Sequence, residues 1–280
     1  MLARRIATAA VLIALISAAL FLLPPRAFGA ALLIVVVIAA NEWASLARFV
    51  GANAIAFVAL IGIVGLALLF GLPRDDEMLR NRVVLTICGV ATLFWIFVAP
   101  PWVVLRWPTR SRVALALVGL IVLIGAWLAL VELKTYSPWL VLAAMAIVWI
   151  ADTAAFFGGR AFGRRKLAPE VSPGKTWEGV CFAITAVALY ALLLAPLAGD
   201  AGFRGAVGMT SIATWIAFAA ALAAVSIVGD LFESLLKRHA GVKDSGRLLP
   251  GHGGVLDRTD ALLAAMPPAA VAAVLFLQKH

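Results

Sequence analysis

The sequence has 280 residues, of which 64% are hydrophobic and only 13% are charged. Soluble globular chains carry about 25% charged residues, so this composition excludes an ordinary soluble domain and indicates a membrane protein. The formal net charge is +9, and the basic residues that produce it lie between the apolar segments. There, anionic headgroups and phosphorylated substrates, rather than nucleic acid, are the natural partners. Cys88 and Cys181 lie inside apolar segments without a CxxC motif, which argues against a disulfide framework or a thiolate metal site.

Nine apolar segments are long enough to cross the bilayer as helices, since a span needs about 20 apolar residues. They cover residues 6–23, 27–47, 54–72, 83–99, 113–131, 139–157, 177–197, 210–236 and 261–277. The second segment is the least regular, because Asn41 and Glu42 interrupt it. We therefore expect an all-α, polytopic membrane bundle of about nine transmembrane helices, with no soluble domain.

The first apolar segment follows Arg4 and Arg5 and could also be a secretory signal peptide. Its apolar core is longer than the usual stretch of about 7 to 15 residues, and further spans follow it. These features favour an uncleaved first helix.

Lysine and arginine are unevenly distributed between alternate sides of the membrane when the N-terminus is placed inside. The outside set has 7 members, namely Arg26, Arg74, Arg80, Arg82, Lys134, Arg204 and Lys279. The inside set has 16 members, namely Arg4, Arg5, Arg48, Arg106, Arg110, Arg112, Arg160, Arg164, Arg165, Lys166, Lys175, Lys237, Arg238, Lys243, Arg247 and Arg258. By the positive-inside rule, the N-terminus and the loops at 158–176 and 237–260 are expected in the cytoplasm.

Charged residues concentrate between positions 229 and 260, which read GDLFESLLKRHAGVKDSGRLLPGHGGVLDRTD. Asp230, Glu233, Ser234 and Lys237 have helical spacing, so they line one face of a helix that leaves the membrane. An ionised Asp near the bilayer centre costs about 2.5 to 3.5 kcal/mol, so it usually faces a cavity, a partner or a metal. Taken alone, Asp230 could equally be a structural partner of Lys237.

The second part of this segment adds two aspartates and a run of glycines. Asp257 and Asp260 lie three residues apart at the start of a helix, so their carboxylates can point the same way. With Asp230 they could form an all-oxygen site for Mg²⁺, which is typically shared with substrate phosphates. Gly253 and Gly254 would let backbone N–H groups approach a phosphate. The structural alternative is a glycine-rich turn capped by Asp257, but such dense charge at a membrane edge favours a function.

A second polar group surrounds the loop at 158–176. It consists of Asp152, Arg160, Ser172, Lys175 and Thr176. The Gly-Lys-Thr at 174–176 suggests a Walker A motif, but that motif requires a glycine where this chain has Pro169. A lysine and two hydroxyls near a helix N-terminus could instead hold an anion. Equally, Ser172 could cap the helix while Lys175 extends to the headgroups.

These segments resemble the phosphatidate cytidylyltransferases, or CDP-diglyceride synthases. The C-terminal signature of that family, S-x-x-K-R-x4-K-D-x5-P-x-H-G-G-x-x-D-R-x-D, is matched by Ser234, Lys237, Arg238, Lys243, Asp244, Pro250, His252, Gly253, Gly254, Asp257, Arg258 and Asp260. Upstream, D-T-x-A-[YF]-F-x-G-R and S-P-x-K-T-W-E-G elements are matched through Asp152, Thr153, Ala155, Phe156, Phe157, Gly159, Arg160, Ser172, Pro173, Lys175, Thr176, Trp177 and Glu178. The resemblance is strong from about 149 to 264, whereas the first half matches as hydrophobic spans.

The resemblance implies that the enzyme transfers CMP from CTP to phosphatidic acid, giving CDP-diacylglycerol and pyrophosphate for phospholipid biosynthesis. It also implies dependence on Mg²⁺, held by carboxylates equivalent to Asp230 and Asp257, and a fold that is commonly dimeric. We expect phosphatidic acid to enter sideways from the bilayer while CTP arrives from the cytoplasm. If the protein is bacterial, it belongs in the cytoplasmic (inner) membrane.

Transfer of this kind is an in-line displacement that needs alignment and charge stabilisation more than covalent help. We expect Asp230, Asp257 and Asp260 to form the metal site. The other expected catalytic residues are Lys237, Arg238, Lys243, Asp244, His252 and Arg258, with His252 as a hydrogen-bond donor to phosphate rather than a base. The expected substrate-binding residues are Asp152, Arg160, Ser172, Lys175, Thr176, Ser234, Gly253 and Gly254.

Two other functions remain compatible with these residues. An ion-coupled transporter also has intramembrane carboxylates, although here the charge clusters at one rim. A CTP-dependent lipid kinase, or another lipid-phosphate transferase, differs from the expected enzyme in the fine spacing of the signature.

Within a single integral membrane unit, we expect residues 1–140 to anchor the protein and enclose the lipid, and residues 141–280 to be catalytic.

Overall fold

A computed structural model describes residues 13–73, 76–108, 111–195, 211–248 and 253–277. Its long helices are α2 (Pro25–Leu46), α3 (Ala52–Gly71), α4 (Glu77–Leu93), α6 (Arg112–Tyr136), α7 (Pro138–Phe162), α8 (Trp177–Leu194), α10 (Ile212–Ala240) and α11 (Leu256–Phe276). A π-helical turn, η1 (Phe94–Val98), joins α4 to α5 (Ala99–Leu105). The strands β1 (Lys166–Ala168) and β2 (Ser172–Thr176) form an antiparallel hairpin between α7 and α8.

The all-helical membrane bundle expected from the sequence is confirmed. In the described residues, eight helical segments are long and apolar enough to cross a membrane, with α4, η1 and α5 counted as one. A shorter apolar helix, Ile13–Leu22, lies in the first expected span, and the start of that span is outside the described residues. The hairpin of β1 and β2 is an addition that the sequence did not predict.

Short polar side chains set the starts of several helices. Ser111 and Ser211 accept hydrogen bonds from the backbone N–H groups of Ala114 and Thr214, which caps α6 and α10. Gly241 ends α10 with a φ of 76°, a left-handed conformation that glycine adopts without steric cost. As a result α10 continues four residues beyond its predicted end at 236, which carries its charged face out to the end of the bundle.

Prolines occur within two of the helical segments without ending them. The predicted fourth span ends at 99, before Pro100 and Pro101, but the helix continues to Leu105 because these prolines occupy the first turn of α5. Pro267 and Pro268 lie inside α11. Membrane helices tolerate such residues because neighbouring helices and local adjustments satisfy the freed backbone groups.

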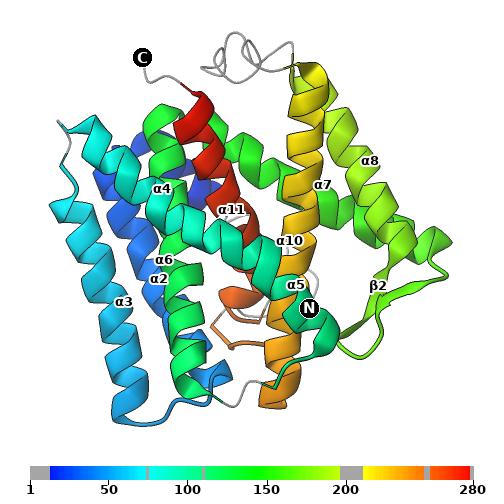
Figure 1. Ribbon diagram of the computed structural model, residues 1–280, viewed down its shortest axis with the longest axis horizontal. Helices are drawn as coiled ribbons and strands as arrows, with labels where there is room; N and C mark the ends of the chain where they lie inside the picture. Colours follow the sequence, from blue (N-terminus) through cyan, green and yellow to red (C-terminus); the bar gives the residue numbers. More distant parts are fainter. Residues whose placement is uncertain (1–12, 74–75, 109–110, 196–210, 249–252, 278–280) are drawn as a thin grey trace.

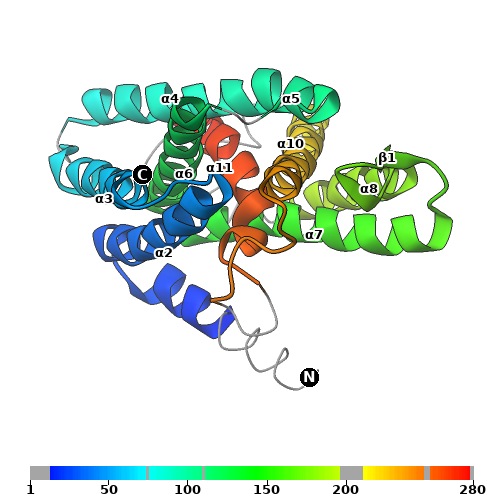
Figure 2. The same ribbon diagram turned by 90° about the horizontal axis from the view of Figure 1, so that it is seen from below.

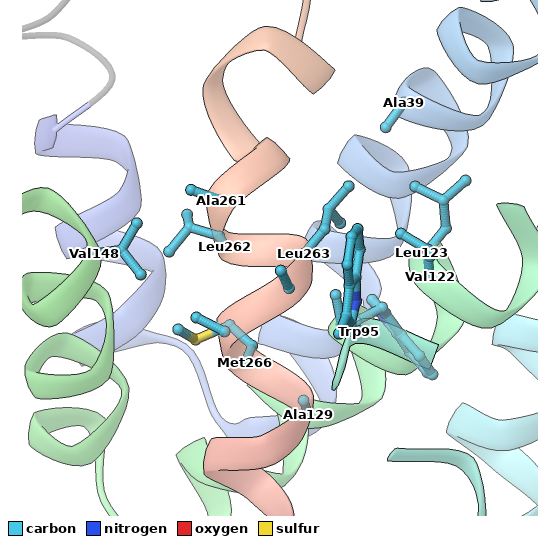
Figure 3. Close-up of a cluster of buried hydrophobic side chains, with 14 of the residues drawn as sticks. Ala39, Trp95, Val122, Leu123, Ala129, Val148, Ala261, Leu262, Leu263 and Met266 are labelled. Atoms are coloured by element: carbon cyan, nitrogen blue, oxygen red, sulfur yellow. The ribbon is translucent and has the colours of Figure 1, made fainter. Parts of the chain in front are cut away.

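Helix α11 lies at the centre of the bundle, and it contacts α2, α4, α6, α7 and α10 (Figure 2). The continuous α4–η1–α5 segment runs along one side of the bundle, while α7 and α8 lie on another side (Figure 2). Leu263 of α11 lies on the side of Trp95 of η1 and Leu123 of α6, whereas Met266 points to the side of Val148 of α7 (Figure 3). The described parts of residues 1–140 and 141–280 therefore share one hydrophobic core.

The connections assigned to one side of the membrane do lie together in space, at the lower end of Figure 1. Arg48, between α2 and α3, donates a hydrogen bond to the carbonyl oxygen of His239 at 2.7 Å. Arg106, after α5, forms an ion pair with Glu170 of the hairpin. At the opposite end, Lys134 donates to the carbonyl oxygen of Leu20 at 2.6 Å. The alternation of sides deduced from the spans therefore agrees with these contacts.

Candidate active site

Helices α10 and α11 approach each other closely at Gly229. A Cβ atom on Gly229 would lie 2.6 Å from the carbonyl oxygen of Asp260 and 2.7 Å from the Cβ of Ala264. Only a residue without a side chain fits this crossing. The crossing places Asp230 beside Asp260, and their carboxyl groups interact electrostatically. Two of the predicted site residues are thus brought together by helix packing.

Lys237 joins the two helices through its ammonium group. Its Nζ lies 2.6 Å from Oε2 of Glu233, one turn earlier in α10, and 2.7 Å from Oδ1 of Asp257 at the start of α11. All three side chains are largely buried, at 14%, 5% and 7% exposure. A buried charge of this kind is stable when it is paired, so the two carboxylates and the lysine hold one another in place.

Asp257 also fixes the glycine-rich turn that precedes it. Its Oδ2 accepts hydrogen bonds from the backbone N–H groups of Ser245 and Gly254, each at 2.8 Å. Gly253 has a φ of 81°, which favours glycine. The cap on the turn, which sequence analysis treated as the structural alternative, is therefore present. The prediction that the N–H of Gly254 is free for a phosphate is wrong in this arrangement, because Asp257 already accepts it.

Lys175 of the hairpin pairs with Asp230, at 2.7 Å between Nζ and Oδ2. Its ammonium also donates to the carbonyl oxygen of Ile227 at 3.4 Å, and Ser234 donates to Oδ1 of Asp230 at 3.3 Å. Asp230 is therefore the partner of Lys175 and not of Lys237. The alternative in which Lys175 extends to the headgroups is wrong, because its ammonium turns toward α10.

The two polar segments found in the sequence meet at this ion pair. Asp152 of α7 interacts electrostatically with both Asp230 and Lys175. Elements α7, β2 and α10 each contribute one of these three charged side chains. The predicted grouping of the upstream and C-terminal elements in one site is therefore supported by their contacts.

The hydroxyl groups of the hairpin differ from their predicted roles. Thr176, rather than Ser172, caps α8, and its Oγ1 accepts a hydrogen bond from the N–H of Gly179 at 3.1 Å. Ser172 instead lies in β2, paired with Ala168 of β1. The difference arises because residues 172–176 are extended and α8 begins only at Trp177. Thr176 is buried, so its hydroxyl serves the helix start.

The remaining predicted residues lie around this centre. Arg160, Lys243, Asp244 and Arg258 are exposed in the described residues. Arg238 donates from Nε to the carbonyl oxygen of Val171 at 3.3 Å, which ties the end of α10 to the hairpin. His252 and Pro250 lie outside the described residues.

The three carboxylates expected to share a cation do not form a ready-made metal site. Within the described ranges, no group of three or more His, Cys, Asp or Glu side chains is arranged to hold a metal ion. The physical reason is that Lys175 and Lys237 engage the carboxylates of Asp230 and Asp257. The donor chemistry nevertheless fits Mg²⁺, which binds through one or two carboxylates together with substrate phosphates. The buried carboxyl group of Glu233 also interacts electrostatically with Asp260.

Sequence reasoning missed Glu42, which reaches the same loop from α2. Its carboxylate accepts hydrogen bonds from the Ser245 hydroxyl and from the backbone N–H groups of Val255 and Leu256. A glutamate inside an apolar span was the available signal, because an ionisable residue in a membrane helix marks a functional site by default.

Comparison with known proteins extends the similarity over almost the whole chain. The model of the cytidylyltransferase family matches residues 3–276. A phosphatidate cytidylyltransferase of Pseudomonas aeruginosa is 41% identical over 274 residues, covering 95% of both chains. One from Haemophilus influenzae is 36% identical over 284 residues, covering 95% of this chain and 96% of the other. The chain has several helices that are long and apolar enough to cross a membrane, and it belongs to the cytidylyltransferase family.

Proposed function

We propose that this chain is a phosphatidate cytidylyltransferase, which transfers CMP from CTP to phosphatidic acid and releases pyrophosphate. Two relatives with this name match the chain over 95% of its length. The observation that carries the proposal is that two ion pairs, Lys175–Asp230 and Lys237–Asp257, lie together at one end of the helical bundle. A site at the end of the bundle can be reached by a lipid headgroup from the side and by a nucleotide from solution.

In the proposed reaction, a phosphate oxygen of phosphatidic acid attacks the α-phosphorus of CTP. A new phosphorus–oxygen bond forms as the bond to the departing pyrophosphate breaks, so no oxidant or further reactant is needed. A phosphate monoester is already ionised near neutral pH, and a strong general base is therefore not required. The protein contributes alignment and charge stabilisation. Lys175 and Lys237, each held by a carboxylate, provide positive charge at fixed positions for the phosphates.

We also propose that Asp230 and Asp260 supply protein oxygens to Mg²⁺, with the nucleotide phosphates completing the coordination. Asp257 remains a proposed third ligand through Oδ1. This oxygen accepts a hydrogen bond from Lys237 and keeps a further lone pair that could bind the ion. Bound Mg²⁺ would supply neutralising positive charge to the triphosphate and the departing pyrophosphate. Arg258 and Lys243 are exposed nearby and are proposed to draw the nucleotide toward the site.

The side of the membrane and the oligomeric state are also proposals. The lysine and arginine count of 16 against 7 supports a cytoplasmic position for the site, in the inner membrane if the organism is bacterial. A homodimer is proposed from the family resemblance. Helix α3 has 22% of its most apolar stretch buried within the chain, so it offers an apolar face to lipid or to a second copy.

Purified protein in detergent, given CTP, Mg²⁺ and phosphatidic acid, is expected to form CDP-diacylglycerol and pyrophosphate in equal amounts. Lipid extraction with mass spectrometry identifies the nucleotide lipid, and a coupled assay measures pyrophosphate. Formation of CDP instead would indicate a CTP-dependent lipid kinase. Consumption of neither substrate, with ion flux in reconstituted vesicles, would support the transporter and contradict this proposal.

Replacement of Gly229 by alanine is expected to lower turnover by about 10- to 100-fold, because the new Cβ meets the α11 backbone and moves Asp260 away from Asp230. Gly89→Ala is the matched control, since nothing lies within 4 Å of a Cβ on this helical glycine. Initial rates of CDP-diacylglycerol formation measure both variants. Equal rates for Gly229→Ala and Gly89→Ala would show that this helix crossing does not set the site.

A further inference from the structure

Glu42 of α2 is far along the chain from the glycine-rich turn, but its carboxylate is part of that turn's structure. The residue is buried, with 6% of its surface exposed. Its Oε1 accepts the N–H of Val255 at 2.9 Å. Its Oε2 accepts the N–H of Leu256 at 2.8 Å and the hydroxyl of Ser245 at 3.0 Å. Three donors thus compensate a carboxylate that would be costly to bury alone.

This carboxylate caps the start of α11 from another helix. The first N–H groups of a helix have no partner inside it, and Val255, the N-cap residue, has no side-chain oxygen to accept them. Glu42 supplies that oxygen, and its negative charge is also favourable at a helix N-terminus. A Cβ on Gly254 would lie 2.5 Å from Oε2 of Glu42, and Gly246 packs on the same carboxylate. The glycines therefore leave the room that the carboxylate occupies.

Ser245 connects Glu42 to the charged pair of the site. Its hydroxyl donates to Glu42 and accepts the N–H of Asp257 at 3.3 Å. The N–H of Ser245 donates to Oδ2 of Asp257 at 2.8 Å, and Oδ1 of Asp257 holds Lys237. A continuous series of hydrogen bonds thus runs from Glu42 of α2 through Ser245 and Asp257 to Lys237 of α10. In this series Glu42 contacts Ser245 and the backbone of α11, and it acts on Asp257 through them.

We propose that Glu42 is a positioning residue for cytidylyl transfer. From α2 it fixes Ser245 and the first turn of α11, so that Asp257 and Lys237 are held where the phosphates of CTP arrive. The inference rests on the proposed function and extends it, because it gives the N-terminal half of the chain a part in the site. A helix of the half that we expect to enclose the lipid would then also hold the residues that meet the nucleotide.

Glu42→Gln tests this role with little change in shape. An amide has one accepting oxygen, and its NH₂ group would face a backbone N–H that also donates, so one donor loses its partner. We expect kcat/KM for CTP to fall by about 10- to 100-fold. Glu42→Asp keeps the charge and is expected to retain more activity than Glu42→Gln. Glu132→Gln is the matched control, since Glu132 is an equally buried glutamate of α6 near the other end of the bundle.

We expect Glu42→Gln to lose kcat/KM, whereas Glu132→Gln keeps the wild-type value. The thermal unfolding midpoint of Glu42→Gln should be no lower than that of Glu132→Gln. Combining Glu42→Gln with Ser245→Ala should cost less than the product of the two single losses, because both changes break the same series of hydrogen bonds. Wild-type kcat/KM in Glu42→Gln, or losses that multiply independently, would overturn the proposal.

Amide hydrogen exchange separates failure of this inference from failure of the proposed function. Peptides covering residues 241–256 are expected to exchange faster in Glu42→Gln than in the wild type, and at the wild-type rate in Glu132→Gln. This measurement needs no turnover. If the wild type makes no CDP-diacylglycerol, the proposed function fails, and unchanged exchange in Glu42→Gln would separately refute the positioning role.

Discussion

Asp257→Ala is expected to reduce the rate of Mg²⁺-dependent pyrophosphate release from CTP and phosphatidic acid by about 100- to 1,000-fold. The change removes the carboxylate that holds Lys237 and accepts the N–H groups of Ser245 and Gly254. Lys237 would then turn to Glu233 alone, and the glycine-rich turn would lose its cap. Both effects displace positive charge from the phosphates, so the initial rate is the measurement that reports the loss.

Asp76→Ala provides a matched control for the lost cap. Asp76 accepts the N–H of Leu79 at 2.8 Å and caps α4, so its removal also deprives a helix start of one acceptor. It takes no part in the cluster around Lys237. We expect Asp76→Ala to keep wild-type turnover, while both variants remain extractable and folded by size-exclusion chromatography. Comparable rates in the two variants would contradict a catalytic role for Asp257.

Asp230→Ala is expected to cause a loss of similar size, about 100- to 1,000-fold, for a different reason. Lys175 loses its carboxylate partner at 2.7 Å, and one proposed oxygen ligand of Mg²⁺ disappears. The rate should therefore fall, and the residual activity should need more Mg²⁺ for half-saturation. A titration of pyrophosphate release against Mg²⁺ concentration measures both quantities in one experiment.

Glu77→Ala is the control for a broken ion pair away from the site. Glu77 lies 3.8 Å from Arg80 in α4, and its side chain is 58% exposed. An exposed pair of this kind contributes little, so turnover and Mg²⁺ dependence should match the wild type. If Asp230→Ala and Asp257→Ala both turn over like the wild type at the same Mg²⁺ concentration, the proposed metal site is excluded.

Several features of the site were accessible from local spacing. Asp257 and Asp260 were predicted at the start of a helix, and α11 does begin at Leu256. The charged face of α10 also followed from residues spaced by three and four, and Lys237 pairs with Glu233 one turn away. Such pairs are set by helix geometry, which the sequence encodes directly.

The partners of Asp230 and Asp257 were not accessible in this way. Sequence reasoning offered Lys237 as a partner of Asp230, but Lys175 takes that place and Lys237 bridges to Asp257. The choice depends on how the hairpin and α11 pack against α10. That packing is fixed by contacts such as the glycine crossing at Gly229, and residue spacing does not describe such contacts.

The sequence by itself determined the membrane class, the approximate positions of the spans in the described residues and which of their connections share a side. These properties follow from runs of apolar residues long enough to cross the hydrocarbon and from the charges between them, and both are local along the chain. Tertiary structure alone decided which partners the charged groups have on other elements, such as Lys175 for Asp230 and Lys237 for Asp257. Glu42 and Ser245 are 203 positions apart, and they meet because α2 and α11 pack together, which satisfies buried polar groups that lipid could not.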